Sequence, residues 1–120
     1  MARQVPILRQ SDVLIASVQE ELSDSEILDL QSRILEDISR KETRHVVVDV
    51  SLVDVLDSFG TRTLTEIAAA VELRGARMAI VGIQPEVAMS MVLLGLKLET
   101  VPTALNLDDG IALLKRTSWN

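Results

Sequence analysis

Residues 46–50 read Val-Val-Val-Asp-Val, and this short run is the strongest indication of the fold. A nearly continuous series of β-branched side chains is typical of a strand that is buried on both faces of a parallel sheet. A second run of this kind, Arg-Met-Ala-Ile-Val-Gly, occupies residues 77–82. Between them, apolar side chains recur at helical spacing from Ser58 to Arg74, and Gly75 is suited to end a helix. A strand, a helix and a strand in this order predict a parallel βαβ unit.

The residues before this unit predict a hairpin and a helix. Two short β-branched runs, residues 5–8 and 13–18, surround a polar turn and indicate a leading β-hairpin. The spacing of Ser23 and Glu26 is typical of a capping box, in which each residue satisfies a backbone N–H near the other. The helix that it opens is predicted to extend to about Lys41.

The residues after the unit continue the alternation. We expect a helix that starts at Pro85 and ends at Gly95, a short strand near residues 99–101 and a last helix over residues 106–116 that Asn106 can cap. The sequence therefore predicts a single α/β domain over residues 1–120. Its sheet is expected to be mixed and mostly parallel, with the leading β-hairpin and about four helices.

The composition restricts both the core and the chemistry. The aromatic residues are only Phe59 and Trp119, so the core must consist of aliphatic side chains and methionine. Met89 and Met91 lie in a strongly apolar predicted helix, where we expect core positions, with an exposed stripe for a partner as the alternative. There is no cysteine, and the one histidine, His45, precedes a strand and is expected to be an ordinary residue there. We therefore expect no cofactor and no metal site, and the composition argues against cysteine nucleophiles and a Ser-His-Asp triad.

The charge of the chain argues against nucleic acid and membranes as partners. Eighteen acidic and twelve basic residues give a net charge of −6, whereas nucleic acid and anionic lipid select basic surfaces. No apolar run reaches the roughly 20 residues that span a bilayer, and the first residues lack a signal-peptide core. We expect a cytoplasmic protein whose partner is another protein. The acidic cluster that contains Glu20 and Glu21 is either a solvated helix start or a surface that steers a basic partner.

The loop after the valine-rich strand is the expected site, because sites in α/β sheets form beyond the carboxyl ends of the strands. Either Asp57 or Ser58 is expected to cap the next helix, which places a hydroxyl where backbone N–H groups favour an anion. A phosphate on Ser58 would add about −1.5 to −2 charges. Asp54 and Asp57 would repel it, and a partner would meet a more negative surface. The simpler interpretation is that Asp57 and Ser58 only cap the helix.

The motif Asp57-Ser58-Phe59-Gly60 resembles the Asp-Ser-Ser/Thr-Gly pattern of the STAS domain, the anti-sigma-factor antagonist family. In that family the motif presents a serine to a protein kinase, so the resemblance implies that Ser58 is the phosphorylated residue. Asp57 would orient the turn, and Gly60 would let the kinase approach closely. Phe59, where the wider family has Ser or Thr, and the segment 81–88 are similar to the stressosome scaffold branch. Thr61, Thr63 and Thr65 remain minor candidate acceptors.

The resemblance also implies partners and a mechanism. The unphosphorylated scaffold would form homodimers and assemble with sensor-bearing STAS paralogues into a large stressosome that holds a serine kinase inactive. Phosphorylation would release the kinase, and a serine phosphatase would reset the site. The candidate partner-facing residues are Asp54, Glu20, Glu21 and Arg62.

Two other classes of function share some of these sequence features. A phosphoacceptor receiver domain has a similar length and β/α alternation, but it needs an acidic pair after its first strand and a lysine after its fifth. Here Gln19 stands between the strand 13–18 and the two glutamates, and Lys97 comes before the last short strand rather than after it. A leading hairpin also does not fit a chain of five alternating β/α units. A small-molecule enzyme would have to use His45 or carboxylates such as Asp49, and carboxylates need separated pKa values for acid and base work.

Overall fold

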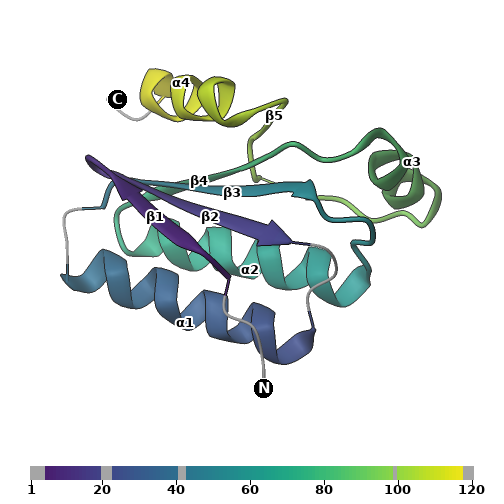
Figure 1. Ribbon diagram of the computed structural model, residues 1–120, viewed down its shortest axis with the longest axis horizontal. Coiled ribbons are helices and arrows are strands. Elements are labelled where there is room, and N and C mark those ends of the chain that lie inside the picture. Colours follow the sequence, from purple (N-terminus) through teal and green to yellow (C-terminus); the bar gives the residue numbers. More distant parts are fainter. Residues whose placement is uncertain (1–4, 20–22, 41–42, 99, 118–120) are drawn as a thin grey trace.

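The valine-rich run lies in the middle of a five-stranded sheet. The computed structural model describes residues 5–19, 23–40, 43–98 and 100–117, and within these ranges the strand order is β1-β2-β3-β4-β5 (Figure 1). The strands are β1 (Ile7–Gln10), β2 (Val13–Gln19), β3 (His45–Leu52), β4 (Arg77–Val81) and β5 (Thr103–Ala104). β1 runs antiparallel to β2, and the other neighbours are parallel. The predicted mixed sheet with a leading hairpin is confirmed.

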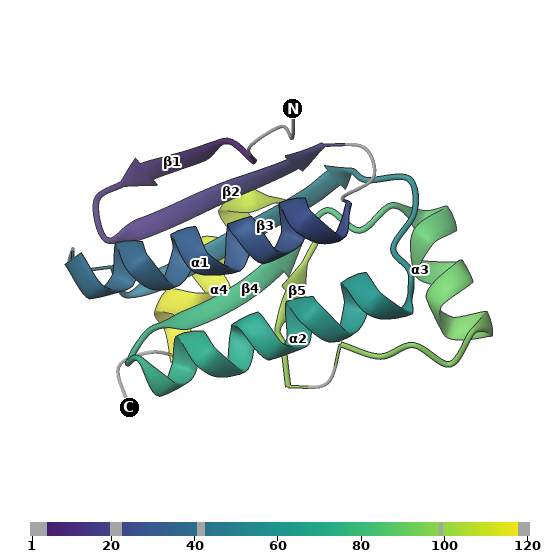
Figure 2. The same cartoon turned by 90° about the horizontal axis from the view of Figure 1, so that it is seen from below.

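The described residues also contain four helices, as expected. They are α1 (Asp24–Arg40), α2 (Ser58–Leu73), α3 (Pro85–Leu93) and α4 (Leu107–Thr117). Helices α1 and α2 cover one face of the sheet, and α4 covers the other (Figures 1 and 2). Helix α3 lies instead beyond the carboxyl end of β3, at the end of the molecule that also holds the start of α2 (Figure 2).

The alternation of side chains along β3 builds a core on each face of the sheet. Val46, Val48 and Val50 belong to the cluster that includes α1 and α2, whereas Val47 packs in the cluster that includes α4. Each of these valines is at most 3% exposed, so the predicted burial on both faces is confirmed. Gly110 lets α4 approach β4 closely, because a Cβ atom at this position would collide with Val81 Cγ1 of that strand.

The local helix signals in the sequence are confirmed at three helix ends. The Ser23 backbone N–H donates to Glu26 Oε1 at 2.9 Å, and the Glu26 N–H donates to Ser23 Oγ at 3.3 Å, which is the predicted capping box. Asn106 Oδ1 accepts from the Asp109 N–H at 2.9 Å and caps α4. Gly75 follows α2 with φ +90°, a conformation that glycine adopts without strain.

Two predictions about the later part of the chain were wrong. The last strand lies at Thr103–Ala104 and not near residues 99–101; Glu99 itself is outside the described residues. Thr100 has φ +66°, and Val101 is buried in a turn closed by its N–H to Leu98 O, so the chain is not extended there. The second correction concerns Met89, which is 60% exposed, whereas Met91 is in the core at 6%.

The exposed side of α3 also carries other large apolar residues. Val92, Leu93 and Leu94 are between 68% and 77% exposed. The helix touches the rest of the protein mainly through Val87 and Met91, its two buried residues. The apolar composition of α3 therefore reflects an exposed stripe as well as core packing. Trp119 lies outside the described residues.

Candidate functional site

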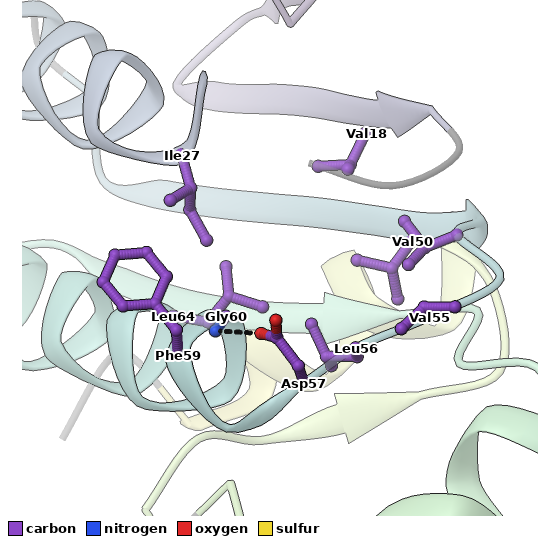
Figure 3. A pocket seen from close by; sticks show the side chains of 10 residues that line it. Val18, Ile27, Val50, Val55, Leu56, Asp57, Phe59, Gly60 and Leu64 are labelled. Atoms are coloured by element: carbon purple, nitrogen blue, oxygen red, sulfur yellow. Dashed lines mark hydrogen bonds between the residues drawn. The ribbon is translucent and has the colours of Figure 1, made fainter. Parts of the chain in front are cut away.

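The loop between β3 and α2 is anchored by apolar side chains. After β3, the Val53 N–H donates to Val50 O at 3.0 Å and turns the chain. Val53 is buried and Leu56 is half-buried in a small apolar hollow that Val18 and Ile27 also line (Figure 3). Burial of these side chains holds the loop against the sheet, so the residues that follow have a defined position.

Asp57, rather than Ser58, is the N-cap of α2. The backbone of Asp57 is extended, and its Oδ1 accepts from the Gly60 N–H at 2.7 Å (Figure 3). Its carbonyl oxygen accepts from the Thr61 N–H at 2.9 Å. The side chain of Asp57 thus satisfies a donor that the helix leaves unpaired, and it fixes the direction of the first turn.

The structure gives Gly60 a different role from the one expected. Gly60 is buried, and a Cβ atom there would lie 3.1 Å from Leu56 Cδ1 and 3.3 Å from Asp57 Oδ1. The missing side chain therefore leaves room for the cap and for the loop inside the protein. It does not open a surface to an approaching partner, so that part of the sequence interpretation is corrected.

Ser58 is exposed at the first position of α2. Among the described residues, no hydrogen bond engages its Oγ atom. The neighbouring hydroxyls differ: Thr61 and Thr63 are only 4% and 3% exposed, and Thr65 donates to Thr61 O at 3.0 Å. Ser58 is therefore the hydroxyl of this turn that a macromolecule can reach without unfolding the helix.

Phe59 stands where the wider family pattern has the smaller Ser or Thr, and its side chain fills space that those residues would leave open. Its ring is half-buried and lines the apolar hollow together with Ile27 of α1 (Figure 3). On the other side, the guanidinium carbon of Arg62 lies 5.8 Å from the ring centroid, within the range of a cation–π contact. Phe59 thus connects the start of α2 to α1 and positions an exposed arginine near Ser58.

Two residues at this end of the sheet were not predicted from the sequence. Gln84 Nε2 donates to Ser51 O at 2.9 Å and lies 3.4 Å from Asp54 Oδ1, which ties the loop after β4 to the loop after β3. Gly82 has φ +81°, and a Cβ atom there would lie 2.9 Å from Ser51 Cβ. Two indirect signals were present in the sequence: the loops that follow neighbouring parallel strands meet at one edge, and both residues lie in the segment 81–88 that resembles the scaffold branch.

Ser58 also borders an open groove of about 350 Å³. The groove lies between the first turns of α2 and the segment after α3, and we call it the α2 groove. It is lined by Ser58, Thr61, Arg62, Thr65, Glu66, Gly95, Leu96 and Lys97. The structure thus brings Ser58, Arg62 and Lys97 together. In the sequence, Lys97 stands out only as a mismatch to a receiver domain.

The other candidate residues lie apart from this site. His45 is buried at the opposite end of β3, with Nε2 4.0 Å from Asp12 Oδ2, and burial lowers its pKa despite that carboxylate. It cannot act together with the loop carboxylates. In the part of the chain that the structure describes, no three His, Cys, Asp or Glu side chains are grouped as a metal site requires. Glu20 and Glu21 lie outside the described residues.

Comparison with known proteins identifies the family. The model of the STAS domain matches residues 4–110. The chain belongs to the STAS domain family. It is similar to the S58E variant of Moorella thermoacetica RsbS, at 35% identity with a TM-score of 0.78, over 93% of this chain and 95% of that one. The same identity, with a TM-score of 0.77, relates it to a chain of the stressosome, described as a signal integration and transduction hub, over 96% of this chain and all of that one.

A curated protein is also similar to this chain over part of its length. The RsbT co-antagonist protein RsbRA of Bacillus subtilis is 34% identical over 83 residues, which are 66% of this chain and 30% of RsbRA. The chain therefore spans about a third of the relative that it matches. The anti-sigma factor antagonist SpoIIAA shares the fold, with 13% identity and a TM-score of 0.66. The resemblance to anti-sigma-factor antagonists is confirmed, and nothing supports a receiver domain. No helix among the described residues could cross a membrane.

Proposed function

We propose that this chain, taken over residues 1–120 as one STAS domain, is a non-catalytic, cytoplasmic stressosome scaffold that is switched by phosphorylation of Ser58. The observation that carries the proposal is the exposed Ser58 hydroxyl at the first position of α2, with the turn fixed by the Asp57 cap. In its unmodified form the scaffold holds an RsbT-like serine kinase. Phosphorylation of Ser58 releases that kinase.

The relatives support this assignment. The M. thermoacetica RsbS structure is of an S58E variant, in which a carboxylate replaces a serine hydroxyl. RsbRA of B. subtilis is named as a co-antagonist of RsbT. A chain that resembles both proteins fits a role in an assembly that controls a kinase of the RsbT type.

The chemistry requires nothing catalytic from this chain. The kinase supplies ATP, and the Ser58 oxygen attacks the γ-phosphorus while the bond to the β-phosphate oxygen breaks. The products are phosphoserine and ADP, and the hydroxyl proton passes to a base of the kinase. The modification converts an uncharged side chain into one of about −1.5 to −2 charges. Asp54 is exposed in the adjoining loop, so the charge of the phosphate adds to that of this carboxylate.

The proposed partners are all proteins. They are further copies of this chain, RsbR-like sensor paralogues, the serine kinase and a serine phosphatase that removes the phosphate. We propose Asp54 and Arg62 as partner-facing residues, because both are exposed on either side of Ser58. Glu20 and Glu21 are proposed for the same role on their charge alone.

The test is to incubate the protein with the RsbT-like kinase of the same organism and ATP, and to map the phosphate by peptide mass spectrometry. We expect one major site, Ser58, and loss of labelling in Ser58→Ala. The matched control is Ser90→Ala, which removes another exposed serine at the same end of the molecule. Undiminished labelling of Ser58→Ala would contradict the assignment.

A further inference from the structure

The α2 groove beside Ser58 carries more positive than negative charge. Arg62 and Lys97 contribute two cations, and Glu66 is the only carboxylate among its lining residues. The groove volume of about 350 Å³ is many times the roughly 10–15 Å³ that a cavity needs to hold one water molecule. A phosphate group therefore fits beside the serine without displacing the protein.

Both cations are available to a new partner. Arg62 follows Ser58 by four residues, so the two side chains lie on one face of the helix. Among the described residues, neither Arg62 nor Lys97 forms an ion pair; Arg62 makes a cation–π contact with Phe59. A doubly charged phosphate would attract the guanidinium more strongly than the face of a ring does.

A buried polar atom next to the groove gives a second, independent indication. Thr61 lines the groove and is 4% exposed, and its Oγ1 has no hydrogen-bond partner among the described residues. A buried hydroxyl without a partner costs free energy in this state, and a ligand that accepts its hydrogen bond would remove that cost. By contrast, the Asp57 carboxylate accepts from the Gly60 N–H and lines the apolar hollow rather than the groove.

We propose that Arg62 and Lys97 bind the phosphate of phosphorylated Ser58 within the same chain, with the Thr61 hydroxyl as a further donor. This inference rests on the proposed role of Ser58. It adds a second element to the switch, because the phosphate draws Arg62 away from Phe59 and from any partner. Phosphorylation then removes a positive group from the docking surface as well as adding a negative one.

The test uses the full chain with phosphoserine placed at position 58 by genetic encoding, so that no kinase is needed. The pH titration of the phosphate is followed by ³¹P NMR in the parent chain and in the Arg62→Gln, Lys97→Gln and double variants. Removing each cation is expected to move the midpoint to higher pH by about half a pH unit. Arg62→Lys should restore most of the effect. The matched control is Arg74→Gln, which removes an exposed arginine at the other end of α2.

Equal midpoints in the parent chain and the double variant would overturn the inference, and so would an equal shift in the Arg74→Gln control. Circular dichroism of each variant checks that α2 is intact, as expected for exposed positions. The result is independent of the proposed function. If the kinase fails to modify Ser58, the encoded phosphoserine still reports whether the groove binds phosphate. If the groove does not bind the phosphate, the proposal that the kinase phosphorylates Ser58 still stands.

Discussion

Replacing the N-cap Asp57 by alanine tests whether the cap positions the phosphorylation site. The substitution removes the 2.7 Å hydrogen bond from the Gly60 N–H to Asp57 Oδ1. Loss of an N-cap side chain typically costs about 1 kcal/mol, which corresponds to roughly 3–5 °C in the melting temperature of a domain of this size. A change of that size shifts a local equilibrium about fivefold. We therefore expect frayed first turns of α2 and Ser58 phosphorylation slowed by up to about fivefold.

The assay combines thermal unfolding with the initial rate of Ser58 phosphorylation. Asp57→Asn is the conservative variant, because asparagine caps helices as well as aspartate does, and it should retain both stability and rate. The matched control is Asn106→Ala at the start of α4, where Asn106 Oδ1 accepts from the Asp109 N–H at 2.9 Å. That variant should lose similar stability, while its phosphorylation rate should stay at the parent value.

Two results would refute this reasoning. If Asp57→Ala keeps the parent melting temperature, the hydrogen bond does not stabilise α2. If Asp57→Asn slows phosphorylation as much as Asp57→Ala does, the carboxylate acts through its charge, for example by contact with the kinase, and not through the cap.

Three further predictions concern the core, the buried histidine and the receiver alternative. Gly110→Ala forces a methyl group against Val81, so urea unfolding should show a loss of about 1–3 kcal/mol; Ala112→Ser on the exposed side of α4 should change stability by less than about 0.5 kcal/mol. Burial lowers the pKa of His45 below 6.5, so the unfolded chain binds more protons. The free energy of unfolding should therefore fall as the pH drops through about 6.5, and His45→Gln should reduce that slope; an equal slope would contradict the burial effect. Acetyl phosphate with Mg²⁺ should leave the chain unlabelled by intact-mass spectrometry, and an aspartyl phosphate would revive the receiver interpretation.

The fold was largely predictable because its strongest signals are local. The valine-rich run of β3 and the capping box of Ser23 and Glu26 each act within a few residues. The last strand was misplaced because its position depends on distant partners. Pro102 O accepts from the Ile80 N–H, and Ala104 pairs with Val81, so β4 decides where β5 forms. No residue pattern around Thr100 indicates that pairing.

The candidate site was predictable only in part, for the same reason. The motif placed Asp57 and Ser58 at a helix start, but spacing alone left open which of them was the cap. The contacts of Gln84 and Lys97 arise from tertiary packing, since each approaches the β3–α2 region from a later part of the chain. The exposure of Met89 was missed because an apolar helix looks the same in sequence whether its stripe faces the core or solvent.

The central claim is tested most directly by the affinity of the RsbT-like kinase for the two forms of this chain. Isothermal titration calorimetry would compare the unmodified protein with protein that carries phosphoserine at position 58. The account predicts tight binding to the unmodified form and a dissociation constant at least about tenfold weaker for the phosphorylated form, equivalent to about 1.4 kcal/mol. Equal affinities, or tighter binding of the phosphorylated form, would contradict it.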